Sequence, residues 1–165
     1  MAKIEFVGLG EYSKKLFALG RAGLGICKAA AYEGADEVAD AVRRSIKSLP
    51  AESDYKAIAN WRSKTPNAYI TEAQKKGLLE GLYLAEMKEE AGFVYTQIGF
   101  AGYNDTKTKT YPNGQANSMI ARSIESGSSA RRKTPFVRPA VNASKEKAIE
   151  RMGEKVQEMI DKIMD

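Results

Sequence analysis

Apolar residues in the first part of the chain recur at a helical spacing. Over residues 11–49, small and apolar side chains return about every 3.6 residues, and Pro50 then interrupts the pattern. This pattern predicts one long helix, or two nearly collinear helices. The predicted face consists of Leu16, Gly20, Gly23, Cys27, Ala30, Gly34, Val38, Ala41 or Val42, Ile46 and Leu49.

The glycines on this face need a structural reason. An interior glycine costs a helix about 1 kcal/mol relative to alanine. We expect a second helix to approach the small residues closely, or the helix to kink near Gly23 and Gly25. Cys27 lies on the same face, and we expect it to be a buried small residue rather than a reactive thiol.

A second helical pattern ends the chain, over residues 139–164. We expect Pro139 to be its first residue, because a helix does not use the N–H that proline lacks at that position. A narrow apolar seam is formed by Val141, Ala148, Met152, Val156, Met159 and Ile163.

Charged residues on this second helix are sorted into columns. The acidic column contains Glu146, Glu150, Glu154 and Glu158, and the basic column contains Lys147, Arg151 and Lys155. Two interpretations remain open. The columns face opposite charges on identical neighbours in a ring, or they are solvated and relieved by pairs three residues apart, such as Lys147 with Glu150 and Arg151 with Glu154.

Shorter elements are predicted between the two helices. Residues 3–7 alternate like a strand, followed by a turn at residues 8–10, and residues 55–62 suit a short helix anchored by Trp61. Thr71 and Gln74 have the spacing of a capping box, which predicts a helix over residues 72–80. Residues 104–115 predict a mobile loop or arm with a tight turn at residues 112–114.

Residues 81–87 and 92–103 predict two antiparallel strands joined by a turn at residues 88–91. One face of the second strand, with Val94, Thr96, Ile98 and Phe100, is expected to contact the core. Phe93 and Tyr95 fall on the opposite face, and we expect them to be exposed or covered by a partner.

Residues 116–141 contain the densest set of local signals. Asn117 is expected to cap a short helix that carries Ile120 and Ile124, and Gly127 is expected to end it. Pro135 and Pro139 are expected to hold Thr134 and Arg138 extended, with Phe136 and Val137 pinned between the prolines. Together the elements predict a single α+β domain over residues 1–165, with a long N-terminal and a long C-terminal helix packed on a small antiparallel sheet.

The same region carries a resemblance. The matching positions are Ala121, Ile124, Glu125, Gly127, Ser128, Ser129, Pro135, Phe136, Val137, Arg138, Pro139 and Ala140. In this order they resemble the signature of the neck or tail-completion family of long-tailed double-stranded-DNA bacteriophages. Residues 4–19 are also similar to that family's opening strand and helix start.

The resemblance implies a structural virion protein of a phage or prophage-derived particle, located at the head–tail junction and present in the host cytoplasm during assembly. It implies a sixfold or twelvefold ring of identical subunits that joins the head-closure component to the tail-terminator or tail-tube proteins. In this interpretation Phe136 and Val137, held between Pro135 and Pro139, pack the loop into the domain or a neighbour, and Gly127 gives the backbone room to turn. A tail-tube terminator that caps the tail is the alternative.

Composition limits other functions. The chain has no histidine and one cysteine, which excludes the common zinc ligand sets, a Ser-His-Asp triad and a Cys-His pair. Gly8 and Gly10 are a weak dinucleotide-binding signal, because Ser13 stands at the third glycine position. We expect no catalytic residue, cofactor or metal. No apolar run approaches the roughly 18 residues of a membrane span, so we expect a cytosolic, non-membrane protein.

The formal charge of +5 is spread over most of the chain, with one local excess. Arg131, Arg132, Lys133 and Arg138 form this positive cluster. Two interpretations remain: these residues hold carboxylates of a partner, or they contact phage DNA without sequence specificity as it passes through a ring. A non-specific DNA-binding protein is therefore a further alternative function.

Overall fold

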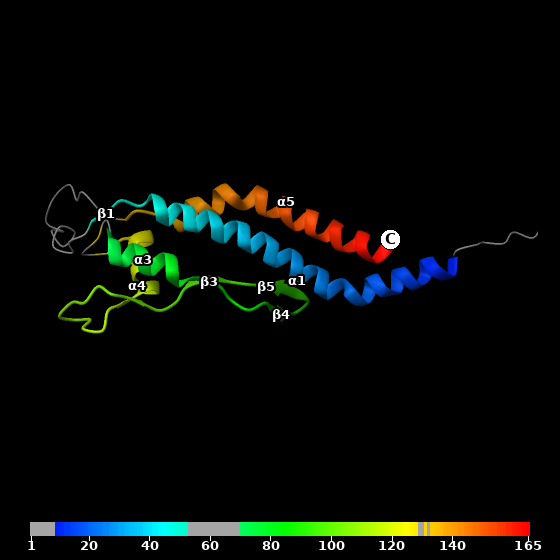
Figure 1. Cartoon of the computed structure of the whole chain (residues 1–165), viewed down its shortest axis with the longest axis horizontal. Coiled ribbons are helices and arrows are strands. Elements are labelled where there is room, and N and C mark those ends of the chain that lie inside the picture. Colours follow the sequence, from blue (N-terminus) through cyan, green and yellow to red (C-terminus); the bar gives the residue numbers. More distant parts are fainter. Residues whose placement is uncertain (1–8, 53–69, 129–130, 132) are drawn as a thin grey trace, which may run out of the picture.

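The computed structural model describes residues 9–52, 70–128, 131 and 133–165. Two long helices, α1 (Leu9–Ser48) and α5 (Val137–Met164), lie side by side along the long axis of the molecule (Figure 1). The short helices α3 (Glu72–Gly81) and α4 (Asn117–Ser126) lie near one end of this pair. The predicted α+β class, with long terminal helices packed with small antiparallel sheets, is confirmed.

Helices α1 and α5 run antiparallel. The Lys15 ammonium group donates hydrogen bonds to the carbonyl oxygens of Met164 (2.7 Å) and Asp165 (3.0 Å). Farther along, a Cβ added to Gly34 would lie 2.6 Å from the Met152 side chain and 3.3 Å from the Ala148 carbonyl oxygen. The predicted close approach of a second helix is therefore confirmed at Gly34.

The expectation is wrong for the earlier glycines and for the cysteine. A Cβ at Gly20, Gly23 or Gly25 would meet nothing within 4 Å, and Cys27 is exposed. The later part of the predicted face is confirmed, because Ala30, Gly34, Val42, Ile46 and Leu49 are buried. Leu16 is 47% exposed, and Ile26 and Ala39 are buried beside the predicted Cys27 and Val38. Burying the large Ile26 side chain in place of the small thiol removes more apolar area from water.

The seam of α5 is confirmed in part. Ala148 is buried as predicted, whereas Val141 is 38% and Met152 36% exposed, and Ala140 and Ser144 are the buried residues at the start of the helix. The later seam positions are half-buried as the spacing predicts: Val156, Met159 and Ile163. Small side chains at the buried positions let the two helix axes come close.

The strands form short pairs rather than one sheet. Strand β1 (Ala51–Glu52) pairs in parallel with β2 (Ile70–Thr71). The antiparallel pairs are β3 (Leu82–Leu84) with β6 (Ile98–Phe100), β4 (Lys88–Glu90) with β5 (Phe93–Tyr95), and β7 (Tyr103–Asn104) with β8 (Gln115–Ala116).

The predicted turn at residues 88–91 is wrong. Residues Lys88–Glu90 form strand β4, and the turn is made by Ala91 and Gly92, with φ of 50° and 80°. Two consecutive residues with positive φ match the right-handed twist of a hairpin, so the chain reverses later than its polar residues suggest.

The predicted faces of this region are confirmed in part. Ile98 and Phe100 are half-buried against the core, and Phe93 is 74% exposed. Tyr95 is half-buried, and its hydroxyl group donates to the Glu90 carboxylate at 3.1 Å.

Local signals predict several element ends correctly. Thr71 and Gln74 form the complete capping box at the start of α3, and Gly127 ends α4 with a φ of 79°. The Gly114 N–H donates to the Tyr111 carbonyl oxygen at 3.2 Å, which closes the predicted tight turn. The predicted turn at residues 8–10 is wrong at Leu9 and Gly10, because helix α1 already includes them. The predicted strand at residues 3–7 and the predicted helix around Trp61 lie outside the described residues.

One apolar core joins the elements at the end of the molecule where α3 and α4 lie. It contains the buried residues Val42, Ile46, Leu49, Ile70, Leu78, Leu82, Ile120, Ala121, Ile124, Phe136 and Ala140. Every helix described here contributes to this cluster, so the core fixes α4 and the start of α5 relative to α1.

Candidate assembly surface

The corner between α4 and α5 contains most of the residues that resemble the phage family. After Gly127 the chain folds back on α4, and the Thr134 N–H donates to the Ile124 carbonyl oxygen at 2.8 Å. Backbone hydrogen bonds join Ser128 and Arg131 at 2.8 and 3.2 Å. A Cβ at Gly127 would lie 3.1 Å from the Lys133 nitrogen, so this glycine satisfies both a positive φ and a close approach.

Glu125 caps the start of α5. Its carboxylate oxygens accept hydrogen bonds from the backbone N–H groups of Phe136 (2.8 Å), Val137 (2.9 Å) and Arg138 (3.1 Å). These are N–H groups that a helix start leaves without an intrahelical acceptor. Partial burial raises the pKa of Glu125, but the N–H groups of Val137, Phe136 and Arg138 outweigh it, so the net pKa is lowered.

The cap explains two errors of the sequence analysis. Helix α5 begins at Val137, so Pro139 is its third residue and Arg138 is helical rather than extended. Proline is tolerated there because N–H groups of the first helical turn have no partner within the helix. Glu125 satisfies the N–H groups that precede it, and the helix can therefore begin two residues earlier.

Phe136 anchors the loop between the helices. Its side chain is 1% exposed, and its ring centroid lies 6.1 Å from that of Phe100 with the planes at 56°. Val137 is half-buried against the same core, while Pro135 and Pro139 are exposed. Phe136 thus packs within its own domain, which is one of the two placements that the resemblance allows.

The predicted positive cluster is divided. Arg131 is half-buried and donates to the Gln74 side-chain oxygen at 3.0 Å. Lys133 and Arg138 are exposed, and Arg132 lies outside the described residues. Arg131 therefore supports the fold, whereas Lys133 and Arg138 remain accessible.

An apolar groove lies beside Arg138. It has a volume of about 500 Å³ and is lined by Gly99, Phe100, Ser118, Ala121, Arg122, Glu125, Val137, Arg138 and Val141. Strand β6 and helices α4 and α5 thus each contribute one wall. Arg122 also lines this groove, although it was not predicted from the sequence. Its place in the sequence does not show that it lies beside α5, because that depends on how α4 and α5 pack.

A buried polar network holds the base of the 104–115 loop. The Gln74 side-chain amide donates to Gln115 at 2.8 Å, and the Thr71 and Thr106 hydroxyl groups lie 3.3 Å apart. The Asn104 amide donates to the Gln115 carbonyl oxygen at 2.9 Å. Both ends of this loop are therefore tied to α3.

Asn117 belongs to the same network, and its predicted role as a helix cap is wrong. Ala116 is the cap of α4 and provides no side-chain hydrogen bond. The Asn117 amide instead donates to the Ala101 carbonyl oxygen at 2.8 Å, and its oxygen lies 3.4 Å from the Asn104 amide nitrogen. The side chain serves a tertiary contact that no local pattern encodes.

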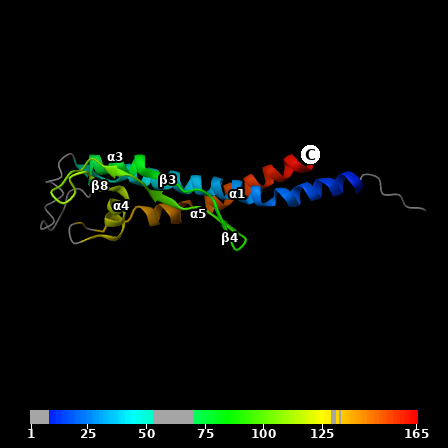
Figure 2. The same ribbon diagram turned by 90° about the horizontal axis from the view of Figure 1, so that it is seen from below.

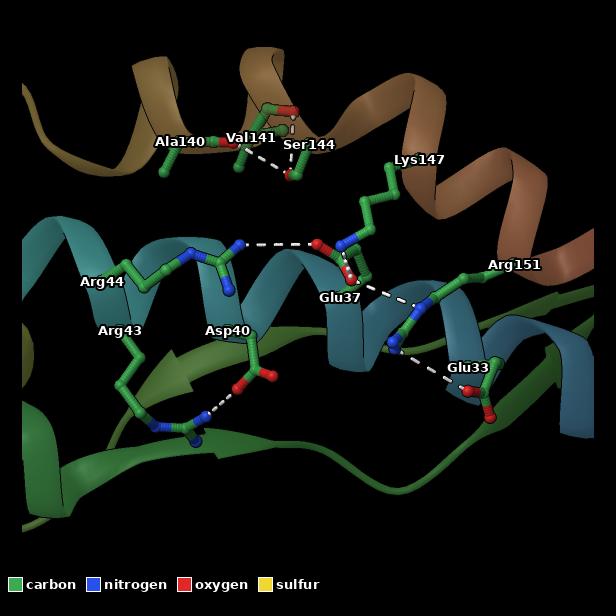
Figure 3. Close-up of polar contacts among 10 residues, drawn as sticks. All are labelled: Glu33, Glu37, Asp40, Arg43, Arg44, Ala140, Val141, Ser144, Lys147 and Arg151. Atoms are coloured by element: carbon green, nitrogen blue, oxygen red, sulfur yellow. Dashed lines mark hydrogen bonds and ion pairs between the residues drawn. The ribbon is translucent and has the colours of Figure 1, made fainter.

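Glu37 joins the two long helices. Its side chain is only 4% exposed, and its carboxylate lies 3.2 Å from the Lys147 ammonium and 3.4 Å from each of the Arg44 and Arg151 side chains (Figure 3). The hydrogen bond from Lys147 lowers the pKa of Glu37 most, burial opposes this, and the charges of Lys147 and Arg151 lower it further.

These ion pairs decide what the basic column of α5 faces. Lys147 pairs with Glu37, and Arg151 lies near both Glu33 (3.8 Å) and Glu37. Lys147 and Arg151 do not form the predicted ion pairs with Glu150 and Glu154 of the same helix. Lys155 and Glu158, which are also three residues apart on α5, do form an ion pair, at 2.8 Å. The basic column therefore faces α1 of the same chain. Hydrogen bonds from Lys155 and Lys162 lower the pKa of Glu158 to about 2.

Comparison of the chain with protein-family models, curated proteins and solved structures finds no match. Within the ranges that the structure describes, no helix has both the length and the apolar character needed to cross a membrane. Over the same ranges, no group of three or more acidic, cysteine or histidine side chains is arranged to hold a metal ion. The site is therefore interpreted from its own geometry.

Proposed function

We propose that the chain is a structural protein of the head–tail junction of a tailed bacteriophage or prophage-derived particle. In this role copies of the chain form a neck or tail-completion ring. The ring contacts the head-closure component on one side and the tail-terminator or tail-tube proteins on the other, and the chain resides in the finished virion.

The observation that supports this proposal most is that the residues resembling the family build one corner of the fold. Glu125 caps α5, Gly127 permits the turn, and Phe136 fixes the loop in the core. Residues spread over positions 121–140 thus serve one corner of the fold. This supports the proposal, because the matching positions act together in one structural unit.

Exposed aromatic side chains give independent support for an assembly role. Phe17, Phe93 and Tyr103 are 73%, 74% and 72% exposed. Large apolar groups on a surface are commonly covered when a protein binds its partners. They lie on three different elements, α1, β5 and β7, so sister subunits and the components above and below the ring can each cover a different one.

The proposal is tested by deleting the gene for this chain from the phage or prophage that encodes it. Electron microscopy should then show DNA-filled heads and separate tails, and supplying the chain from a plasmid should restore joined particles. A Glu125→Ala and Phe136→Ala double variant, which removes both anchors of the corner, should fail to restore them. Joined, infectious particles in the complete absence of the chain would refute the proposal.

A further inference from the structure

The β4–β5 hairpin presents an apolar side chain opposite an acidic one. Figure 2 shows the hairpin projecting away from the α1–α5 pair. Phe93 pairs with Glu90 across the hairpin and is 74% exposed. Glu89 pairs with Val94 on the opposite face of the hairpin, and its carboxylate is 3.9 Å from the Lys28 ammonium. Lys88 shares the face of Phe93 but lies one cross-strand pair farther from the turn. Glu90 accepts a hydrogen bond only from the neutral Tyr95 hydroxyl among the bonds of the described residues, so its negative charge is the one directly opposite Phe93.

The groove beside α4 and α5 has the opposite character. Its walls are mainly apolar, and Arg122 and Arg138 are exposed at its edge. Glu125 is the acidic residue of the lining, and its carboxylate is already bound to the start of α5. The groove is therefore a place for an apolar side chain that is accompanied by negative charge.

We propose that the β4–β5 hairpin of one copy binds in the α4–α5 groove of a second copy. Phe93 enters the groove, and Glu90, which lies opposite Phe93 on the same face of the hairpin, approaches Arg122 and Arg138. The exposure of Phe93 means that the hairpin does not fill the groove of its own chain. Because the two surfaces differ, the contact is head-to-tail, and repeated contacts of this kind close into a ring when the rotation between copies permits it.

This inference deepens the proposed function by naming the contact between subunits, and it rests on that function only for the ring. Cross-linking of the purified chain tests it directly. A Cys27→Ser background removes the exposed native thiol. One chain then carries Phe93→Cys and a second carries Ser118→Cys, a residue of the groove lining.

Mixing and mild oxidation should give the mixed disulfide dimer as the main product. Phe17→Cys, at an equally exposed phenylalanine on α1, replaces Phe93→Cys in the control and should give little mixed dimer. A main product that joins two Phe93→Cys chains, or no cross-link at millimolar protein, would overturn the proposal.

Substitutions test the same contact without cross-linking. Phe93→Ala should raise the dissociation constant for self-association about tenfold or more, as expected for a central aromatic anchor, while Phe17→Ala should leave it within about twofold. Glu90→Arg and Arg122→Glu should each weaken association, and a mixture of these two variants should regain it. Equal effects of Phe93→Ala and Phe17→Ala, or no recovery in the mixture, would count against the hairpin as the donor.

The hairpin contact and the place in a virion can be refuted independently of each other. If the mixed dimer forms but particles assemble without the chain, the contact is real and the place in a virion is wrong. If heads and tails separate without the chain but Phe93→Ala restores joined particles at normal yield, the place in a virion stands and the hairpin contact is wrong.

Discussion

Glu125 offers a sharp test of how the corner between α4 and α5 is built. Its carboxylate receives three backbone N–H groups from the start of α5, at 2.8, 2.9 and 3.1 Å. Glu125→Ala leaves these N–H groups without their acceptor and removes a negative charge from the positive end of a helix. Glu125→Gln keeps an acceptor oxygen but removes the charge.

The expected magnitudes follow from the two contributions. Loss of a side-chain cap costs about 1 kcal/mol, and hydrogen bonds to a charged group are worth about 1.5–3 kcal/mol. Because water reaches the half-buried carboxylate, we expect Glu125→Ala to lower the free energy of unfolding by about 2–3 kcal/mol and Glu125→Gln by about 1 kcal/mol. For a chain of this length the Ala variant should melt about 5–10 °C lower.

Acidification gives the charge contribution a distinct signature. The pKa of Glu125 is lowered in the folded chain, so its contribution is fully present above the unfolded pKa near 4.5 and is lost as the pH falls through the folded value. The stability difference between the wild-type chain and Glu125→Gln should therefore be constant near neutral pH and shrink below about pH 4.5.

Urea unfolding followed by circular dichroism, repeated from pH 7 to pH 3, measures both effects. Glu146→Gln is the matched control, because Glu146 is exposed on α5, the helix that Glu125 caps. This substitution should change the free energy of unfolding by less than about 0.5 kcal/mol. A Glu125→Ala variant as stable as the wild-type chain, or a Glu125→Gln difference that does not change with pH, would refute the role assigned to this carboxylate.

Further substitutions test the packing of the domain by the same unfolding measurement. Phe136→Ala should cost roughly 3–5 kcal/mol because the ring is fully buried in the monomer; an unchanged melting temperature would place the ring outside the core. Gly23→Ala should stabilise α1 by about 0.5–1 kcal/mol because its Cβ meets open space, whereas Gly34→Leu should cost about 1–3 kcal/mol by displacing Met152; equal effects would contradict the close approach at Gly34. Gln74→Ala should cost about 2–3 kcal/mol because buried partners lose their hydrogen bonds, and a cost below about 0.5 kcal/mol would show that the polar network is not needed.

Features set by neighbouring residues were predictable from the sequence. The capping box of Thr71 and Gln74 and the end of α4 at Gly127 each depend on a few adjacent positions, and both are confirmed. The long helices were predictable because their apolar periodicity extends over many turns. Near the middle of α1 the buried position is Ile26 and not the predicted Cys27, because periodicity alone did not separate these two neighbours.

Features that depend on tertiary contacts were not predictable in detail. Asn117 has the residue type of a cap, but its amide is used to hold Ala101. Pro139 suits a first helical position, but Glu125 from another helix allows α5 to begin earlier. Polar residues favoured a turn at residues 88–91, and pairing with β5 makes Lys88–Glu90 a strand instead.

The sequence predicted some residues of the candidate assembly surface and missed others. Phe136, Gly127 and Arg138 were singled out from the sequence and lie at the corner or its groove. Arg122 was missed because its role depends on which side of α4 faces the groove. Arg131 was grouped with its charged neighbours, but folding turns it toward Gln74.

The central claim is that the chain is a component of the head–tail junction. Electron cryomicroscopy of finished particles tests it most directly, because the density at the junction can be compared with the α1–α5 pair and the α4–α5 corner. The account predicts several symmetry-related copies of the chain between head and tail. Finished particles whose junction is fully explained by other proteins, and from which this chain is absent, would contradict it.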